Sequence, residues 1–255
     1  GGQEKYGLEA ERILMECAKW DPKGSTGYRY NDEAGMPYAY YFSRTYTFVN
    51  ELLAPHLLQH GYSTVSARLI GNARLRERRG GIKAWLAVKQ DICRHLQSDK
   101  GSIATTMVDY YALPASGAKA WPGRAEANTK THADKATTVE AALMQDLSHT
   151  LALPNASQRF VPFVVLHEFE ALLFSDCAAF ANGISRPDLS ADFQRIRDSF
   201  ATPENINDSP VTAPSKRVEA LIPGYEKPLL GVLAALEIGL EKMRHECPHF
   251  ADWVG

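Results

Sequence analysis

The chain has 255 residues, of which 45% are hydrophobic and 23% are charged, a composition typical of a folded globular protein. This length allows one large domain or two small ones, and the composition excludes collagen-like, low-complexity and largely disordered proteins. The net charge is -2, so binding to a polyanion such as nucleic acid would need a local basic patch.

The apolar runs of the chain are short. The longest, from Phe160 to Leu166, is far below the roughly 20 residues that cross a bilayer, and the first residues do not resemble a signal peptide. The 4 cysteines are too far apart for a CxxC motif. We therefore expect a cytoplasmic protein with no membrane partner and with reduced thiols.

The first part of the chain predicts helix and loop. Residues 3–20 place apolar side chains at helical spacing, and residues 21–35 are rich in Gly, Pro and Asn and predict a polar loop. Aromatic residues then crowd residues 36–48. A second helical pattern predicts a helix over 47–60 that ends before Gly61.

From residue 62 onward, segments whose apolar residues have the spacing of a strand alternate with segments that have the spacing of a helix. Strands are expected at 62–70, 102–109 and 160–166, with helices at 82–96 and 133–151. Strands separated by helices of this length are typical of right-handed βαβ units. We therefore expect an α/β fold, with a mainly parallel sheet flanked by helices.

The C-terminal third of the chain predicts a helical region, with helices at about 189–199, 215–221 and 228–244. In the final string RHECPHFADW, Phe250 and Trp253 are expected to dock on the core.

Acidic residues follow two of the predicted strands. Asp109 ends the string SIATTMVD, while Glu168 and Glu170 follow FVPFVVLH, with Asp176 further along. Because the carboxyl ends of parallel strands meet at one edge of a sheet, we expect these carboxylates to converge. Mg²⁺, with Mn²⁺ as a substitute, would be held by Asp109, Glu168 and Asp176. The catalytic carboxylates would be Asp109, Glu168 and Glu170. The alternative is that Asp109 or Glu168 caps the N-terminus of a helix.

Two basic strings are candidates for phosphate binding. In RLIGNARLRERRGGIK arginines lie beside flexible glycines, and in TAPSKR two cations follow the natural N-cap Ser215. The candidate nucleic-acid and phosphate contacts are Arg74, Arg76, Arg78, Arg79, Lys216 and Arg217. A solvated surface loop and a well-capped ordered loop explain the two strings equally well.

Several catalytic motifs are missing. The chain has no GxGxxG, GxxxxGK[ST] or GxSxG string. His132 and His149 have no second histidine four residues away, and we disfavour a zinc hydrolase. The sequence therefore predicts no nucleotide or other organic cofactor.

Residues 47–255 resemble the bacterial family DUF4276, in the strings TFVNELLAPHL, RGGI, MVDYYALP, WPGR, RFVPFVVLHEFEALLFSD, TPENIND, TAPSKR and CPHF. That family is grouped with Toprim-like proteins, relatives of the OLD and RloB types, often found beside ATPases in phage-defence or mobile loci. The resemblance implies a Toprim-like α/β domain over 47–255, a nucleic-acid or ATPase partner, and Mg²⁺-dependent cleavage of phosphodiesters.

The sequence departs from the family pattern ahead of the family's first helix. Family members carry an acidic EGxTE turn there, whereas the two glutamate positions fall here near Tyr41 and near Thr45 or Tyr46. Asp109 matches the first acid of the Toprim DxD motif, but Tyr111 stands at the second. We therefore expect impaired cleavage, and the alternative is a non-catalytic partner subunit of an ATPase.

Residues 3–46 resemble a helical hairpin from the (α/α) toroid of heparinase II/III-like polysaccharide lyases. Residues 1–46 would then be a helical segment of foreign type, and the chain would be a chimera. A carbohydrate-active protein is a weaker third alternative, because a single hairpin lacks the neighbouring helices that complete a toroid.

Overall fold

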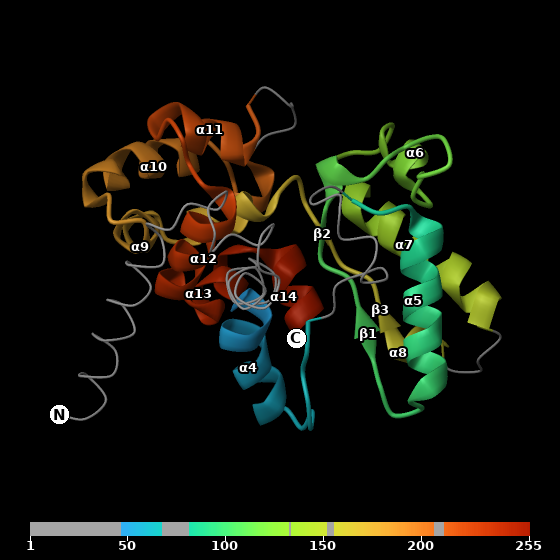
Figure 1. Ribbon diagram of the computed structural model, residues 1–255. Coiled ribbons are helices and arrows are strands. Elements are labelled where there is room, and N and C mark those ends of the chain that lie inside the picture. The colour runs from blue at the N-terminus through green and yellow to red at the C-terminus, as the bar shows by residue number, and fades with distance from the viewer. Residues whose placement is uncertain (1–46, 68–81, 133, 152–155, 207–211) are drawn as a thin grey trace, which may run out of the picture.

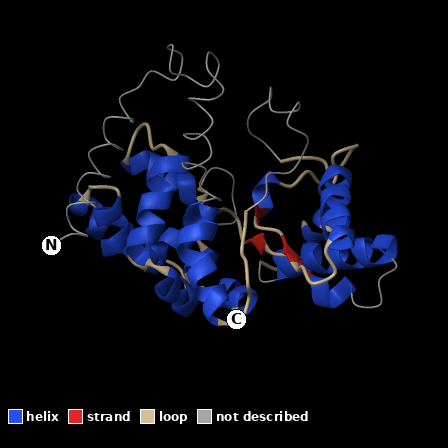
Figure 2. Cartoon of the chain, turned by 60° about the horizontal axis from the view of Figure 1, so that its bottom comes forward, coloured by secondary structure: helices blue, strands red, loops and turns tan. Residues whose placement is uncertain are grey.

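The computed structural model describes residues 47–67, 82–132, 134–151, 156–206 and 212–255 (Figure 1). The expected helical hairpin and loop over 3–46, the arginine string over 68–81, and Cys17 lie outside the described residues. Across the described part, the elements form two groups that meet at the strands. Figure 2 shows that helices make up most of both groups.

One group is helical and is built mainly from the C-terminal third of the chain. Its elements are η1 (Val49–Leu53), α4 (Ala54–Gln59), η4 (Phe169–Ser175), α9 (Cys177–Gly183), η5 (Pro187–Leu189), α10 (Ser190–Arg197), η6 (Pro203–Asn205), α11 (Pro214–Leu221), α12 (Lys227–Ile238), α13 (Leu240–Glu246) and α14 (Pro248–Val254).

The other group holds the strands and the helices that follow them. Its elements are α5 (Trp85–Ser98), β1 (Ala104–Thr105), β2 (Val108–Asp109), η3 (Tyr110–Ala112), α6 (Arg124–Ala127), α7 (Asp134–Leu151), α8 (Ala156–Arg159), β3 (Phe160–Val161) and β4 (Val164–Val165). The fold is thus mixed α/β, with short parallel strands and flanking helices, as expected.

The four short strands form one interrupted ribbon. β1 pairs with β3 and β2 with β4, both in parallel, and the offset between partners is the same from Ala104–Phe160 to Asp109–Val165. Pro162 has no backbone N–H for a ladder hydrogen bond. The side chain of Thr106 bonds the backbone of Phe163 instead. The predicted parallel pairing of 102–109 with 160–166 is confirmed.

Two other predictions of secondary structure are wrong. Residues 62–67 are turn and coil rather than strand, and residues 68–70 lie outside the described part. Tyr62 is among the exposed large hydrophobic residues, so the segment lacks the buried face that would hold a strand. The helix expected over 228–244 is divided by Gly239, whose φ of +78° ends α12 before α13 begins.

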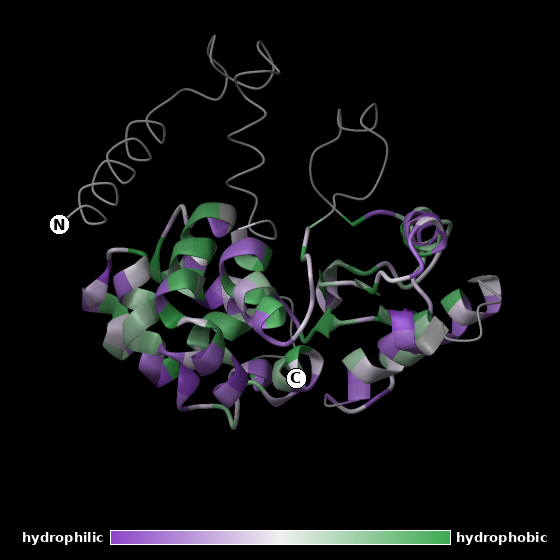
Figure 3. Ribbon diagram, turned by 90° about the horizontal axis from the view of Figure 1, so that it is seen from below, coloured by the Kyte–Doolittle hydropathy of each residue, from purple (hydrophilic) through white to green (hydrophobic). Residues whose placement is uncertain are grey.

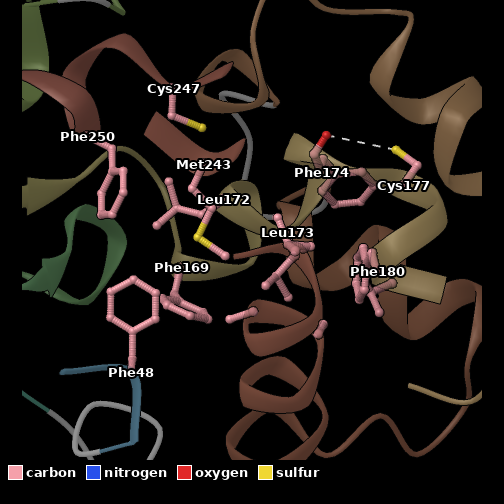
Figure 4. Packing of buried hydrophobic residues seen from close by; sticks show 14 of the residues in the cluster. Phe48, Phe169, Leu172, Leu173, Phe174, Cys177, Phe180, Met243, Cys247 and Phe250 are labelled. Atoms are coloured by element: carbon pink, nitrogen blue, oxygen red, sulfur yellow. Dashed lines mark hydrogen bonds between the residues drawn. The ribbon is translucent and has the colours of Figure 1, made fainter. Parts of the chain in front are cut away.

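Two hydrophobic clusters stabilise the two groups. In the cluster of the helical group, Phe48 packs edge-on against Phe169 (Figure 4). In the same cluster Phe180 stacks on Phe193. The other cluster packs α5 and α7 against the ribbon. Hydrophobic stretches concentrate inside each group and along the strands (Figure 3). The helix faces buried in these clusters account for the helical spacing of apolar residues in the sequence.

Helix α14 connects the two groups. Phe250 is fully buried, and the ring of Trp253 stacks on that of Phe163 at 4.3 Å between centroids. The Trp253 Nε1–H donates to Thr105 Oγ1 at 2.8 Å. The predicted docking of Phe250 and Trp253 is confirmed, and it attaches the C-terminal helix to the ribbon.

The described cysteines are buried free thiols, Cys93, Cys177 and Cys247. Burial raises the pKa of Cys177 to about 12, so this thiol stays protonated and unreactive at neutral pH. Within the described residues, no helix is both long and apolar enough to cross a membrane.

Candidate functional site

The carboxyl ends of β2 and β4 lie side by side, because Asp109 and Val165 are direct partners across the ribbon. Two hydrogen bonds connect the chain segments that follow the two strands. The Phe169 N–H donates to Asp109 Oδ1 at 3.0 Å, and the Tyr111 N–H donates to the His167 carbonyl at 3.3 Å. The structure therefore brings the HEFE string next to Asp109, at the edge where open α/β sheets bind ligands.

Glu168 points toward the start of α11. Its Oε2 accepts a hydrogen bond from the Ser215 N–H at 3.0 Å, and its Oε1 lies 3.5 Å from Lys227 Nζ. A carboxylate at a helix N-terminus is favourable because it satisfies a free N–H and the helix dipole. Glu168 thus acts as a cap supplied from a distant part of the chain. The Ser215 hydroxyl is fully buried and has no hydrogen-bond partner among the described residues.

The carboxylates expected to hold a metal are not assembled. Asp176 caps α9 by accepting hydrogen bonds from the Ala178 and Ala179 N–H groups at 3.1 and 2.9 Å. The seven residues of η4 separate Glu168 from Asp176, and at about 2 Å of rise per residue they carry Asp176 away from the strand ends. In the part of the chain that the structure describes, no group of three or more His, Cys, Asp or Glu could hold a metal ion.

Glu170, the third expected catalytic carboxylate, lies in η4 and is only 1% exposed. It is buried within the helical group instead of facing solvent, so it would reach a substrate only if the segment moved.

A histidine pair that sequence reasoning did not assign lies at the same edge. His167 directly follows the second strand segment, and its Nε2 contacts Nε2 of His132, with ring centroids 4.5 Å apart. The Tyr111 ring packs against the His167 ring, with centroids 5.1 Å apart. His167 is 1% exposed and adopts a φ of +64°, a left-handed conformation that costs a non-glycine residue about 1–3 kcal/mol. The fold thus holds the backbone of His167 in a strained conformation.

The TPEN string contains Glu204, which caps the N-terminus of α14. Glu204 is 5% exposed and accepts hydrogen bonds from the His249 and Phe250 N–H groups at 3.0 and 2.9 Å. Oε1 of Glu140 accepts from the Val164 N–H at 2.8 Å and lies 3.0 Å from His249 Nε2. This cluster fastens α14 to α7 and β4.

The charges of this cluster shift two pKa values. Burial raises the pKa of the Glu204 carboxyl, although the two backbone hydrogen bonds oppose that shift. Burial alone would lower the pKa of His249, but the hydrogen bond to Glu140 and the charges of Glu140 and Glu204 outweigh it and raise that pKa. His249 is therefore held as a structural imidazole with a strong affinity for its proton.

The predicted phosphate contacts differ in their surroundings. Lys216 pairs with Glu219 at 2.6 Å, but its side chain is exposed, so a ligand can reach the ammonium group. The Arg217 guanidinium lies over the Phe200 ring at 5.1 Å, and its Nε donates to the Thr212 carbonyl. These contacts give Arg217 a structural role. The other expected contacts, Arg74, Arg76, Arg78 and Arg79, lie outside the described residues.

Two HxxxH pairs were missed in the sequence, His56 with His60 on α4 and His245 with His249, the second of which reads HExxH. His245 and His249 lie on different helices, and their rings contact Glu246 and Glu140, so they do not form the helical zinc motif. In the first pair the two rings lie close together. The His56 and His60 rings are tilted by 37° with centroids 4.3 Å apart, and His60 Nδ1 hydrogen-bonds the His56 carbonyl. Burial, Arg244 and His60 lower the pKa of His56. His60 Nδ1 is taken by the backbone, and among the described residues the pair belongs to no group of three or more His, Cys, Asp or Glu that could hold a metal ion.

A cavity of about 490 Å³ lies away from the strand ends, between α9, α10 and α13. Its lining includes Arg197 and Lys242, both ion-paired with Glu246 at 3.2 and 3.3 Å. Asp176, Asp198 and Glu246 also line the cavity, so its carboxylates outnumber its two cations and it is a poor phosphate site.

These features define a mixed α/β protein with acidic and imidazole side chains at the ends of two parallel strands. The chain belongs to the family described as domain of unknown function (DUF4276), which matches residues 45–255. Comparisons with curated proteins and with solved structures found no match.

Proposed function

We propose that this protein is a defence-associated, Toprim-like domain that acts on nucleic acid at the strand-end edge. Its reaction would be metal-dependent cleavage of phosphodiesters. The observation that carries the proposal is the placement of Asp109 and Glu168 after adjacent parallel strands, with Phe169 hydrogen-bonded to Asp109. Carboxylates at such an edge are the ligands that Mg²⁺ or Mn²⁺ prefers.

The donor set for that metal is incomplete on the described residues. Asp109 and Glu168 each accept a backbone hydrogen bond, and Asp176 caps α9. The glutamates of the family's EGxTE turn are replaced near Tyr41 and Thr45. Losing a catalytic acid or base typically costs a hundredfold or more in rate, so we expect little or no cleavage by this chain alone.

A second function is favoured by the Glu168 contacts. Glu168 already accepts a hydrogen bond from the Ser215 N–H and pairs with Lys227, so protein groups occupy both of its oxygens. This arrangement suits a non-catalytic partner subunit that binds nucleic acid or an ATPase through the same scaffold.

The two functions are separated by measuring binding and cleavage with the same samples. Single- and double-stranded DNA and RNA are incubated with the full chain and Mg²⁺ or Mn²⁺, and binding of each cation is followed by calorimetry. Asp109→Ala is compared with Asp188→Ala, a change at an exposed aspartate that pairs with Arg186.

Nucleic-acid binding with at most trace cleavage supports the proposal, and cleavage should rise when an EGQTE turn is restored ahead of Thr47. Robust cleavage by the unaltered chain that is lost in Asp109→Ala or Glu168→Ala would show that the missing glutamates are not needed. A chain that binds no nucleic acid would reject the proposal.

A further inference from the structure

We propose that the start of α11 is a binding site for a phosphate monoester, and that Glu168 occupies this site as an internal competitor that the phosphate displaces. The site consists of the Ser215 N–H and hydroxyl together with the ammonium groups of Lys216 and Lys227. The inference deepens the proposed function, and it rests on that function only in taking the ligand to be the terminal phosphate of a nucleic acid.

The first turn of α11 offers one backbone donor to an anion. The helix begins at Pro214, which has no N–H. The N–H groups of Lys216 and Arg217 both donate to the Ala213 carbonyl, at 2.8 and 3.1 Å. The Ser215 N–H is therefore the donor that this turn presents to another group, and the helix dipole adds to its attraction for negative charge.

The hydroxyl of Ser215 is a second donor at the same end of the helix. It is fully buried and has no hydrogen-bond partner among the described residues. The Cα–Cβ bonds of an α-helix tilt toward its N-terminus, so this hydroxyl is directed toward the end of α11 at which Glu168 binds. Buried polar groups normally have partners, and a buried hydroxyl without one indicates a group that the site is built to receive.

The carboxylate of Glu168 fills this site incompletely. Its Oε2 accepts a hydrogen bond from the Ser215 N–H at 3.0 Å, while its Oε1 lies 3.5 Å from Lys227 Nζ, longer than the roughly 2.8 Å of a charge-assisted hydrogen bond. Neither oxygen bonds the Ser215 hydroxyl. A phosphate monoester has three acceptor oxygens and a charge of about -1.5 to -2, so it can bond the N–H, the hydroxyl and an ammonium group together.

Two lysines lie within electrostatic reach of Glu168. Lys227 contacts it directly and is 34% exposed. The hydrogen bond to Glu219 and the charge of Glu219 raise the pKa of Lys216, and the charge of Glu168 adds to this rise. Because Lys216 is already paired with Glu219, Lys227 is the main cation of the site. The Glu168 side chain is 16% exposed, so the site borders on solvent and an anion can reach it.

Competition between Glu168 and phosphate has a definite sign. While the carboxylate occupies the site, an incoming anion must displace it, and the apparent affinity is lowered by the fraction of molecules in which the site is free. Removal of the Glu168 charge should therefore strengthen phosphate binding, whereas a purely structural cap gives no such gain. The displaced carboxylate would become available near Asp109, where the proposed function requires it.

The test is a titration of the full chain with inorganic phosphate, followed by calorimetry and by the NMR signal of the Ser215 N–H. Glu168→Gln should bind phosphate about tenfold more tightly than the unaltered protein, because the amide lacks the charge that competes for the site. Ser215→Ala should bind it about tenfold more weakly, since a hydrogen bond to a charged group is lost. The stability of Ser215→Ala should not fall, because the hydroxyl has no partner to lose.

Glu226→Gln is the matched control for charge. It removes the same charge from the exposed residue that precedes Lys227, and it should change the phosphate affinity by less than about twofold because exposed charges are screened. If Glu168→Gln does not fold, the unaltered protein serves. The signals of the Ser215 N–H and of the Glu168 carboxyl carbon should then shift at the same phosphate concentration.

Three results would overturn the proposal: no gain in phosphate affinity in folded Glu168→Gln, unchanged affinity in Ser215→Ala, or a Ser215 N–H signal that does not respond to phosphate. Oligonucleotides with and without a terminal phosphate identify the source of the ligand. A preference for the phosphorylated oligonucleotide that is lost in Ser215→Ala supports a nucleic-acid terminus. Binding of inorganic phosphate without binding of any oligonucleotide would support the site and reject the proposed function.

Discussion

The hydroxyl of Thr106 holds both backbone polar groups of Phe163. It accepts a hydrogen bond from the Phe163 N–H at 3.1 Å and donates one to the Phe163 carbonyl at 3.2 Å. One side chain thus replaces the backbone ladder where the ribbon is interrupted. The relationship keeps the register constant from β1 to β4, and this register brings Asp109 beside Val165.

Thr106→Val should destabilise the protein by about 1–3 kcal/mol, because the isosteric side chain leaves the buried N–H and C=O of Phe163 without partners. Urea unfolding measures the loss. Thr137→Val is the control, since the Thr137 hydroxyl is exposed and bonds only a carbonyl of its own helix. Equal losses for the two variants would show that the hydroxyl of Thr106 is not needed for the ribbon.

Glu204→Gln should lower the thermal stability through α14. The carboxylate accepts from the N–H groups of His249 and Phe250, whereas a glutamine amide has one oxygen and turns a donor toward the second N–H. We expect a loss of about 1–3 kcal/mol. The exposed Glu237→Gln on α12 should change the melting temperature little, and a similar fall in both variants would contradict the capping role.

The contribution of His249 to stability should depend on pH. Its pKa is raised in the folded state, so the folded protein holds the proton more tightly than the unfolded chain does. The stabilisation is complete below the unfolded pKa of about 6.5 and is lost as the pH rises through the folded pKa. The pKa of Glu204 is also raised, so its protonation acts in the same direction.

The measurement is the difference in unfolding free energy between the unaltered protein and His249→Gln, from about pH 6 to about pH 9. The difference should shrink as the pH rises. A constant difference over this range would mean that the charge of His249 does not contribute to stability.

The sequence predicted correctly which two segments form the ribbon, but it also predicted a third strand that the described part of the chain does not contain. The segments 102–109 and 160–166 are apolar and β-branched, and each finds its partner in the other, so the local pattern and the fold agree. Residues 62–67 have a weaker alternation, and no strand pairs with them in the described part of the chain. A strand depends on its neighbour as much as on its own sequence.

The site was predicted in part, for the same kind of reason. The rule for parallel strands placed Asp109 and Glu168 at one edge, but it did not show that η4 carries Asp176 away to cap α9. His132, His167 and Asn205 are far apart in the sequence and meet only through tertiary packing. No spacing rule detects such a set. The signal that was available is a histidine directly after a buried strand.

The proposed nucleic-acid binding should weaken with salt, because cations that contact phosphates release counterions from the nucleic acid. Lys216, exposed in the first turn of α11, is the described cation best placed for such a contact. Lys216→Ala should therefore reduce the slope of log affinity against log salt by about 1, with similar effects for different sequences.

Fluorescence anisotropy with a labelled oligonucleotide at several salt concentrations measures this slope. Lys242→Ala is the matched control, because Lys242 is also an exposed helical lysine paired with a glutamate, but it lies on α13 beside the cavity. Arg217→Ala is less suitable, since loss of its contact with Phe200 would also destabilise α11. If Lys216→Ala and Lys242→Ala reduce the slope equally, the attraction is spread over the surface and α11 is not a phosphate-binding element. A reduction in Lys216→Ala alone would place the nucleic-acid backbone at the start of α11, where Glu168 already bonds the Ser215 N–H.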